Sequence, residues 1–253
     1  MPKSRGVRRI TTVMIVNSFD PANDAIINPA SLAPSIEGFP KNAAVCFGER
    51  MITELKEHYE PVQIDTMIAC IEIPIYKINY KGKEIAVYCN TLGGPAAAGL
   101  LEEMISSSCG VLNRDIAAKS LIVPTAAYRD EGTSYHYAPP TEYIEVITAP
   151  RLSEILTELR LSHICGKTWT TDAVYRETRS NMEKRKRDGC LTVEMECASI
   201  MAVAQFRGVD AYQFLYAADN LDDIEWEART LGSLPQSQRE QYLRIALEVV
   251  VRV

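Results

Sequence analysis

The sequence has few histidines, and the number and spacing of its cysteines do not match a metal site or a disulfide framework. Its 253 residues include only three histidines, and none of its seven cysteines belongs to a C-x-x-C pair. No zinc-type cluster is therefore expected, and an odd number of cysteines argues against a complete disulfide framework. We predict that the protein binds no metal and that its thiols are reduced, as is typical of cytoplasmic proteins.

Excess positive charge and long apolar runs are also missing. The net charge is −6 and the pI is about 5.3, so the chain lacks the basic surface of a nucleic-acid-binding protein. The densest basic run, Lys184–Arg187, fits the solvated end of a helix. The apolar run Val13–Val16 is too short for a signal peptide or a membrane span, although a transit peptide stays open because no acid precedes Asp20. We predict cytoplasmic localisation, with neither nucleic acid nor membrane as a partner.

What is present is an ordinary globular composition, with 47% apolar and 24% charged residues. The proline-containing residues 1–42 indicate an N-terminal arm, and residues 43–253 one domain. Strands alternate with helices there, which predicts an α/β fold with helices on both faces of a sheet.

Pro74 predicts that its strand lies at a sheet edge. The expected strands are 43–47, 71–79, 84–90, 120–125, 167–171 and 211–217. The expected helices are 49–59, 93–105, 150–160, 177–187, 195–206 and 236–252.

Ligands bind at the carboxyl ends of strands in such folds, and an acidic segment stands out there. Glu194, Met195 and Glu196 begin an apolar helix. Acids at a helix start interact favourably with its dipole, which accounts for one surface glutamate. Glu196 precedes the apolar positions Cys197 and Ile200, so we expect it to be buried and to need donors such as sugar hydroxyls. The residue types alone leave the structural and the sugar-binding interpretation equally open.

Two further strand ends carry candidate groups. Asp219 closes the apolar run Phe214–Ala218, and a turn or helix cap is the commoner use of such an aspartate. Its alternative is a general acid whose pKa is raised by apolar walls. Ser108-Cys109-Gly110 is a turn of small residues, whose backbone N–H groups could reach an oxyanion. Each of these signals is weak by itself.

Taken together, these segments resemble the purine nucleoside and uridine phosphorylase family. The resemblance is carried by R-D-E-G-T-S at 129–134, T-T-D-A-V-Y at 170–175, V-E-M-E-C-A at 193–198 and A-A-D-N at 217–220. It covers residues 43–253 and is weakest in the first third. It implies a single domain in three layers, with a mixed central sheet flanked by helices. It also implies a homo-oligomer that needs no cofactor and uses inorganic phosphate as a co-substrate.

The resemblance assigns roles to matching positions. It implies that Asp219 protonates the purine at N7 as the base leaves. The ribose would be held by Glu194, Met195 and Glu196. The base would contact Val174 and Tyr175, and the phosphate Ser108 and Arg50. His136 receives no role.

The sequence departs from the family pattern in two places. The family's Gly-rich phosphate turn is replaced by Gly48-Glu49-Arg50, which keeps only the arginine. The run Leu100–Ile105 then leads directly to the Ser108 turn, so about ten residues are absent, roughly the length of a strand. We therefore expect one strand to be shortened or missing, with weaker phosphate binding and lower stability.

The sequence thus predicts phosphorolysis of nucleosides to the free base and ribose-1-phosphate. Purines are favoured over pyrimidines, because the uridine enzymes lack the aspartate at position 219 and hold the base with a glutamine and an arginine. Residues 176–179 do not match that pattern cleanly. The alternatives are a hydrolytic nucleosidase of the same superfamily and a non-catalytic nucleoside-binding member.

Overall fold

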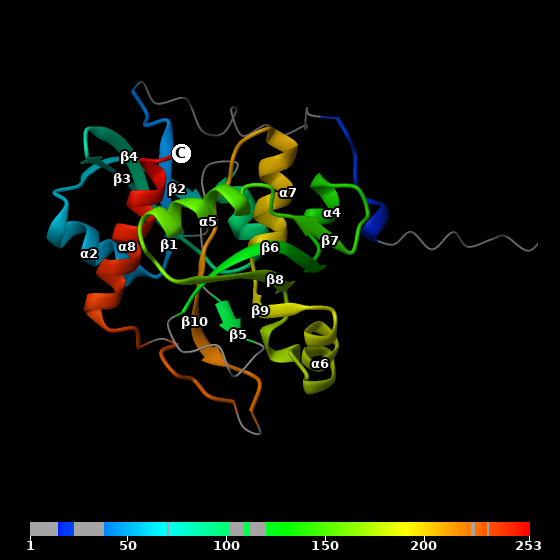
Figure 1. The fold of residues 1–253 in the computed structure, drawn as a ribbon. Helices are drawn as coiled ribbons and strands as arrows, with labels where there is room; N and C mark the ends of the chain where they lie inside the picture. The colour runs from blue at the N-terminus through cyan, green and yellow to red at the C-terminus, as the bar shows by residue number, and fades with distance from the viewer. Residues whose placement is uncertain are drawn as a thin grey trace, which may run out of the picture.

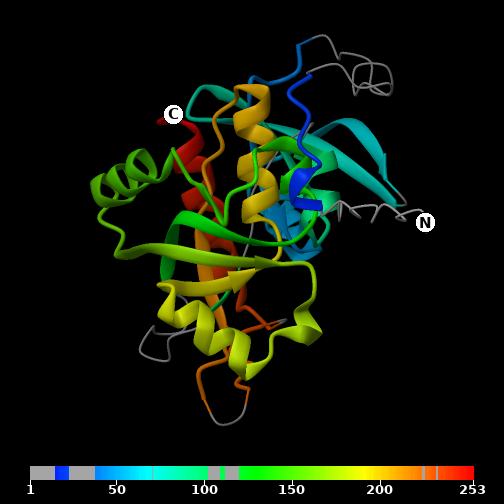
Figure 2. The same cartoon turned by 90° about the vertical axis from the view of Figure 1, so that its right-hand side faces the viewer.

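The computed structural model describes residues 15–22, 38–69, 71–101, 109–111, 120–223, 226–231 and 233–253. They form two mixed β-sheets with helices packed around them (Figures 1 and 2). The predicted α/β fold in a single domain is confirmed. The single central sheet is a correction, because the strands are divided between two sheets.

The first sheet has four strands in the order β1-β4-β3-β2. The bounds of its strands are Asn42–Phe47 (β1), Val62–Ala69 (β2), Ile71–Tyr80 (β3) and Lys83–Asn90 (β4). β1 and β4 are parallel, whereas the predicted hairpin of β3 and β4 is antiparallel, as is the pair β2 and β3. Alternate residues of these strands face opposite sides of the sheet, and both sides carry buried apolar residues. Helices cover both faces for this reason.

One face packs against α2 (Glu49–His58) and α8 (Gln236–Val250), which Figure 1 shows side by side. Leu55 of α2 is fully buried there. The other face contacts α3 (Gly94–Leu101) through Leu100. The amphipathic pattern of α2 and α8 follows from this single buried side.

The second sheet has six strands in the order β10-β5-β9-β8-β6-β7, and β10 also pairs with β6. The bounds are Cys109–Val111 (β5), Leu121–Asp130 (β6), Tyr143–Glu145 (β7), His163–Thr171 (β8), Cys190–Glu194 (β9) and Leu215–Asn220 (β10). The extra pairing closes five strands into a ring, whose interior holds Ile122, Leu215 and Ala217.

The remaining helices cover this second sheet. Their bounds are Ser134–Tyr137 (α4), Ala149–Glu158 (α5), Arg179–Arg187 (α6) and Cys197–Arg207 (α7), with 3-10 turns at Ile15–Asn17 (η1) and Val174–Arg176 (η2). α6 packs on Trp169 through Met182, while α5 and α7 share the largest core cluster. Within the described residues, no helix combines the length and apolar character needed to cross a bilayer.

α7 is the central helix of the molecule, and Figure 2 shows it upright between the two sheets. Every residue from Cys197 to Ala204 is buried, as the apolar sequence of this helix predicts. The helix ends at Gly208, which adopts the expected left-handed conformation with φ 67°.

Two strand predictions need correction. β3 is an internal strand and not an edge, but β4 pairs with it only from Tyr76 to Tyr80. Pro74 therefore has a paired neighbour on the β2 side alone, which is why the missing N–H is tolerated. The strand expected at 211–217 begins at Leu215 and continues to Asn220. Asp219 thus lies inside the strand and not after it.

The turn predicted at Cys109 and Gly110 is wrong, because both residues belong to the strand β5. β5 has three residues and links β10 to β9 within the second sheet. Cys109 pairs with Ala217 of β10, and Gly110 pairs with Val193 of β9. Ser108 and the end of the helix expected at 93–105 lie outside the described residues. In the predicted N-terminal arm, the described segment 15–22 contains η1, whose Ile15 approaches Gly132.

The contact between α3 and α7 depends on a glycine. A Cβ on Gly94 would overlap the Oγ of Ser199, which is fully buried and donates to Glu131 Oε2 over 2.7 Å. Gly94→Ala is therefore expected to lower the free energy of unfolding by about 1–3 kcal/mol, measured by urea denaturation.

Gly99 on the same helix is the matched control, because nothing lies within 4 Å of a Cβ placed there. Gly99→Ala should be neutral or stabilise by about 0.5–1 kcal/mol. Equal effects of the two substitutions would contradict the close approach.

Candidate active site

The start of α7 is built around the carboxylate of Glu194, the last residue of β9. Its Oε2 accepts the backbone N–H groups of Glu196 (2.8 Å) and Cys197 (2.6 Å), and its Oε1 accepts the Thr170 hydroxyl over 2.5 Å. Burial and the neighbouring Glu196 raise the pKa of Glu194 to about 8, against the opposing effect of these hydrogen bonds. Glu194 therefore caps the helix in this structure.

Glu196 is the N-cap residue of α7 and is only 2% exposed, as its sequence position predicted. Its Oε1 accepts the backbone N–H of Gly93 over 2.8 Å. Gly93 follows β4 with φ 101°, a conformation that favours glycine. This contact ties the end of the first sheet to the acidic segment. Met195 is half-buried between the two glutamates.

Asp219 lies near the carboxyl end of β10 and is 9% exposed. Its Oδ2 accepts the indole N–H of Trp226 over 2.9 Å. Burial raises the pKa of Asp219, while the hydrogen bond from Trp226 and the charge of Arg229 act in the opposite direction. An upward shift caused by loss of solvation is what the general-acid alternative for Asp219 requires.

Glu177 was missed by the sequence analysis. It follows η2 and is half-buried. Burial and the charge of Asp219 raise its pKa to about 7. The only sequence signal was the stretch 176–179, which does not match the uridine pattern cleanly. Glu177 thus lies close enough to Asp219 for the charge of that aspartate to raise its pKa.

The register of the second sheet relates the two strands that carry Glu194 and Asp219. β5 lies between β10 and β9. Gly110 pairs with Val193, one residue before Glu194, and Cys109 pairs with Ala217, two residues before Asp219. Because β5 is antiparallel to β9 and parallel to β10, the carboxyl ends of β9 and β10 point in opposite directions. Glu194 and Asp219 therefore do not share the common edge expected of strand ends in an α/β fold.

Arg50 lies on the other side of this region, in the first turn of α2. It is exposed and lines a cavity of about 510 Å³ between β1 and β10. The cavity wall also includes Asn90 and Leu92, which precede Gly93, and Tyr216, which precedes Asp219 on β10. None of the three acids Glu194, Glu196 and Asp219 lines it. The cavity therefore adjoins the acidic strand ends without containing them.

The two predicted base-binding residues are exposed on η2. Val174 is 46% and Tyr175 is 97% exposed. The described chain thus leaves both side chains available to a ligand or to another protein surface.

Two cysteines lie near the ends of β1 and β4, and one of them, Cys46, lines the cavity. Cys46 and Cys89 are opposite each other in the parallel pair, and Cys89 Sγ accepts the Gly48 N–H over 3.3 Å. The hydrogen bond from the Cys46 thiol, together with that N–H, lowers the pKa of Cys89 to about 7, although burial opposes the shift. Burial instead raises the pKa of Cys190 to about 11.

This difference predicts selective alkylation, because the thiolate is the reactive form. Below pH 7 both thiols are protonated; as the pH rises through 7, Cys89 should ionise and react with iodoacetamide while Cys190 stays protonated. Peptide mass spectrometry of samples labelled between pH 6 and 9 measures both sites. Equal labelling of the two cysteines at pH 8 would contradict the assignment.

Comparison with known proteins places these observations in a family. A family model described as "Phosphorylase superfamily" matches residues 43–252. The DeoD-type purine nucleoside phosphorylases of Bacillus cytotoxicus and Bacillus thuringiensis are each 25% identical over 186 residues, which cover 68% of this chain and 78% of theirs.

Solved structures share the fold at lower sequence identity. Purine nucleoside phosphorylase from Toxoplasma gondii, in complex with immucillin-H, has a TM-score of 0.69 at 16% identity, covering 83% of this chain and 90% of its own. Uridine phosphorylase from Vibrio fischeri has a TM-score of 0.68 at 18% identity, covering 84% and 92%. A mutant MTAN of Helicobacter pylori, with 5'-methylthioadenosine in its active site, has a TM-score of 0.65 at 17% identity, covering 85% and 99%.

Proposed function

This chain belongs to the phosphorylase superfamily, and on that premise we propose that it cleaves purine nucleosides with inorganic phosphate, releasing the free base and ribose-1-phosphate. The observation that carries the proposal is the pair of buried carboxyl groups, Glu196 at the start of α7 and Asp219 near the end of β10. The relationship to DeoD-type purine nucleoside phosphorylases supports the choice of purines.

Asp219 is the proposed general acid. A phosphate oxygen forms a bond to the anomeric carbon while the bond from that carbon to N9 breaks, and the electron pair moves into the purine ring. The carboxyl proton of Asp219 goes to N7 and neutralises the charge that develops on the leaving base. The raised pKa of Asp219 keeps this proton in place at higher pH than in an exposed aspartate.

Glu196 and Met195 are proposed to bind the ribose. The carboxylate of Glu196 accepts hydrogen bonds, as it does from the Gly93 N–H, and sugar hydroxyls donate them. Hydrogen bonds to sugar hydroxyls would hold the anomeric carbon in line with the phosphate, which lowers the entropic cost of the reaction. Glu194 supports this by fixing the backbone of Glu196.

The remaining proposed roles follow the position of each residue. Arg50, in the wall of the cavity, and Ser108 would bind phosphate. Val174 and Tyr175 would contact the base from η2. Glu177, beside Asp219, lies where it could accept a hydrogen bond from the base.

Hydrolysis by water is the second candidate. It is favoured by the short β5 and the altered Gly48 loop, which weaken the proposed phosphate side, and by the shared fold with MTAN. A non-catalytic nucleoside-binding protein is the third, and the intact buried acids argue against it.

Product analysis distinguishes these functions. Inosine, adenosine and uridine are incubated with and without phosphate, and the products are separated by chromatography. We expect free purine base and ribose-1-phosphate, formed only with phosphate. Free ribose without phosphate would identify a nucleosidase, and binding without turnover a non-catalytic member.

Asp219→Asn tests the acid. It should lower kcat/KM for inosine by about 10²–10⁴-fold, because an amide cannot donate the proton. The exposed Asp210→Asn is the control. 7-Methylguanosine already carries a methyl group at N7, so its cleavage should be affected far less. Equal losses on both substrates would show that Asp219 has another role.

We also propose that the protein is a cytoplasmic homo-oligomer acting in purine salvage. Large exposed apolar side chains support an assembly, since an interface would cover them. They include Leu92 (70%), Tyr175 (97%), Trp226 (61%) and Leu231 (51%). Light scattering after size-exclusion chromatography measures the mass directly, and a value near 28.2 kDa would refute the assembly.

A further inference from the structure

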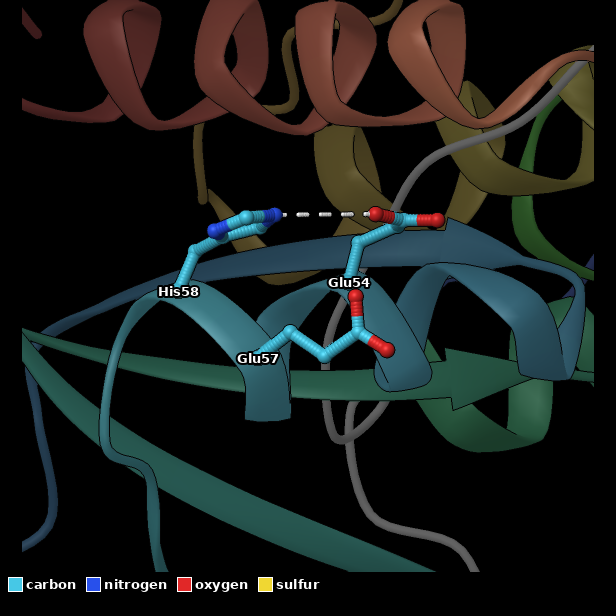
Figure 3. A group of neighbouring side chains, drawn as sticks. All are labelled: Glu54, Glu57 and His58. Atoms are coloured by element: carbon cyan, nitrogen blue, oxygen red, sulfur yellow. Dashed lines mark ion pairs between the residues drawn. The ribbon is translucent and has the colours of Figure 1, made fainter.

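The last turns of α2 carry a group of side chains outside the proposed active site. Glu54, Glu57 and His58 are spaced i, i+3 and i+4, so they share one side of the helix. One ligand atom from each lies within 4.8 Å of the others. Figure 3 shows the His58 ring and the Glu54 carboxylate pointing toward each other, with Glu57 beside them.

Glu54 supplies a second, independent observation. Its side chain is 1% exposed, and its Oε1 accepts from Arg239 Nε (3.0 Å) and Nη2 (2.8 Å) of α8. Its Oε2 is buried without a hydrogen-bond partner and faces His58 Nε2 at 3.8 Å, beyond hydrogen-bond distance. A buried carboxylate oxygen without a donor is costly, which indicates that another group can bind there.

We propose that Glu54, Glu57 and His58 form a binding site for a divalent transition metal of the Zn²⁺ or Co²⁺ type. Ligand atoms on a tetrahedral zinc lie roughly 3.3 Å apart, given bonds of about 2.0–2.1 Å, so the 3.8 Å separation needs only a small contraction. An imidazole with two carboxylates favours such ions over Mg²⁺ or Ca²⁺. Water would complete the coordination.

The surroundings fit this ion. Two carboxylates balance its charge, and Arg239 on the other oxygen of Glu54 orients that ligand as outer partners of metal sites do. Gln236 Nε2 donates to Glu57 Oε2 over 3.2 Å in the same way. His58 is 40% exposed, which leaves a route for entry. The bound ion would lie beside α8, whose Arg239 also lines the cavity.

No metal site was expected from the sequence, because its cysteines and histidines form no cluster. The available signal was the spacing E-x-x-E-H of residues 54–58 within one helix. Only the structure shows that Glu54 is the buried member.

Titration of the full-length protein with Co²⁺, followed by visible absorption and calorimetry, tests the site. We expect one equivalent to bind without the strong near-ultraviolet band of a cobalt–thiolate bond, and Zn²⁺ to displace it. His58→Gln and Glu57→Gln should each raise the Kd about tenfold or more, with unchanged circular dichroism. His136→Gln and Glu183→Gln, both exposed on other helices, are the controls.

The proposal is overturned by any of three results. These are no Co²⁺ binding up to millimolar concentration, a thiolate band that places the ion on cysteines, or equal affinity in His58→Gln and His136→Gln. An ordinary ion pair between Glu54 and His58 gives the first result. The outcome is independent of nucleoside cleavage.

Discussion

The buried start of α7 is the constraint on which the rest of the structure depends. A helix leaves its first N–H groups unpaired, and these groups lie where water does not reach. Glu194 accepts two of them and Thr170 Oγ1 accepts the Ala198 N–H over 3.0 Å, while the same hydroxyl donates to Glu194. Strands β8 and β9 are thereby fixed to the helix. Glu196 is fixed in turn, and it binds the Gly93 N–H at the end of β4. A short chain of polar contacts thus connects the two sheets.

This arrangement explains why Glu194 has a raised pKa. A helix buried on all sides requires an apolar surrounding, and the same surrounding removes water from the carboxyl group that caps its start. Burial raises the pKa of Asp219 on β10 in the same way, and Glu177 lies close enough for the charge of Asp219 to influence it. Burial that stabilises the fold therefore prepares a proton donor as well, because loss of solvation favours the protonated carboxyl group. The packing of the core and the chemistry proposed for the site have the same physical origin.

The sequence predicted the parts of the fold in which local pattern and tertiary environment agree. The apolar run of α7 with its Gly208 end, the hairpin of β3 and β4, and the burial of Glu196 are examples. It did not predict β2, β7 and β9, which are short or mixed in polarity and gain their pairing from neighbours far away in the sequence. The division into two sheets depends likewise on the register of β5 and β10. Glu177 and Glu54 were missed for the same reason, since each acquires its character only from burial and from partners such as Asp219 and Arg239.

One departure from the family pattern, the altered Gly48 loop, lies apart from the acids of the proposed site. Glu194 and Asp219 belong to the second sheet, Glu196 begins α7, and their side-chain contacts involve Thr170, the α7 backbone and Trp226. Arg50 lies in the first turn of α2 after β1, and β1 pairs only with β4 among the described residues. A cavity of about 510 Å³ lies between β1 and β10. None of the three acids lines that cavity, so the altered Gly48 loop leaves the proposed ribose and base positions intact and changes the proposed phosphate position. We expect the choice between phosphate and water as the attacking group to depend on that position.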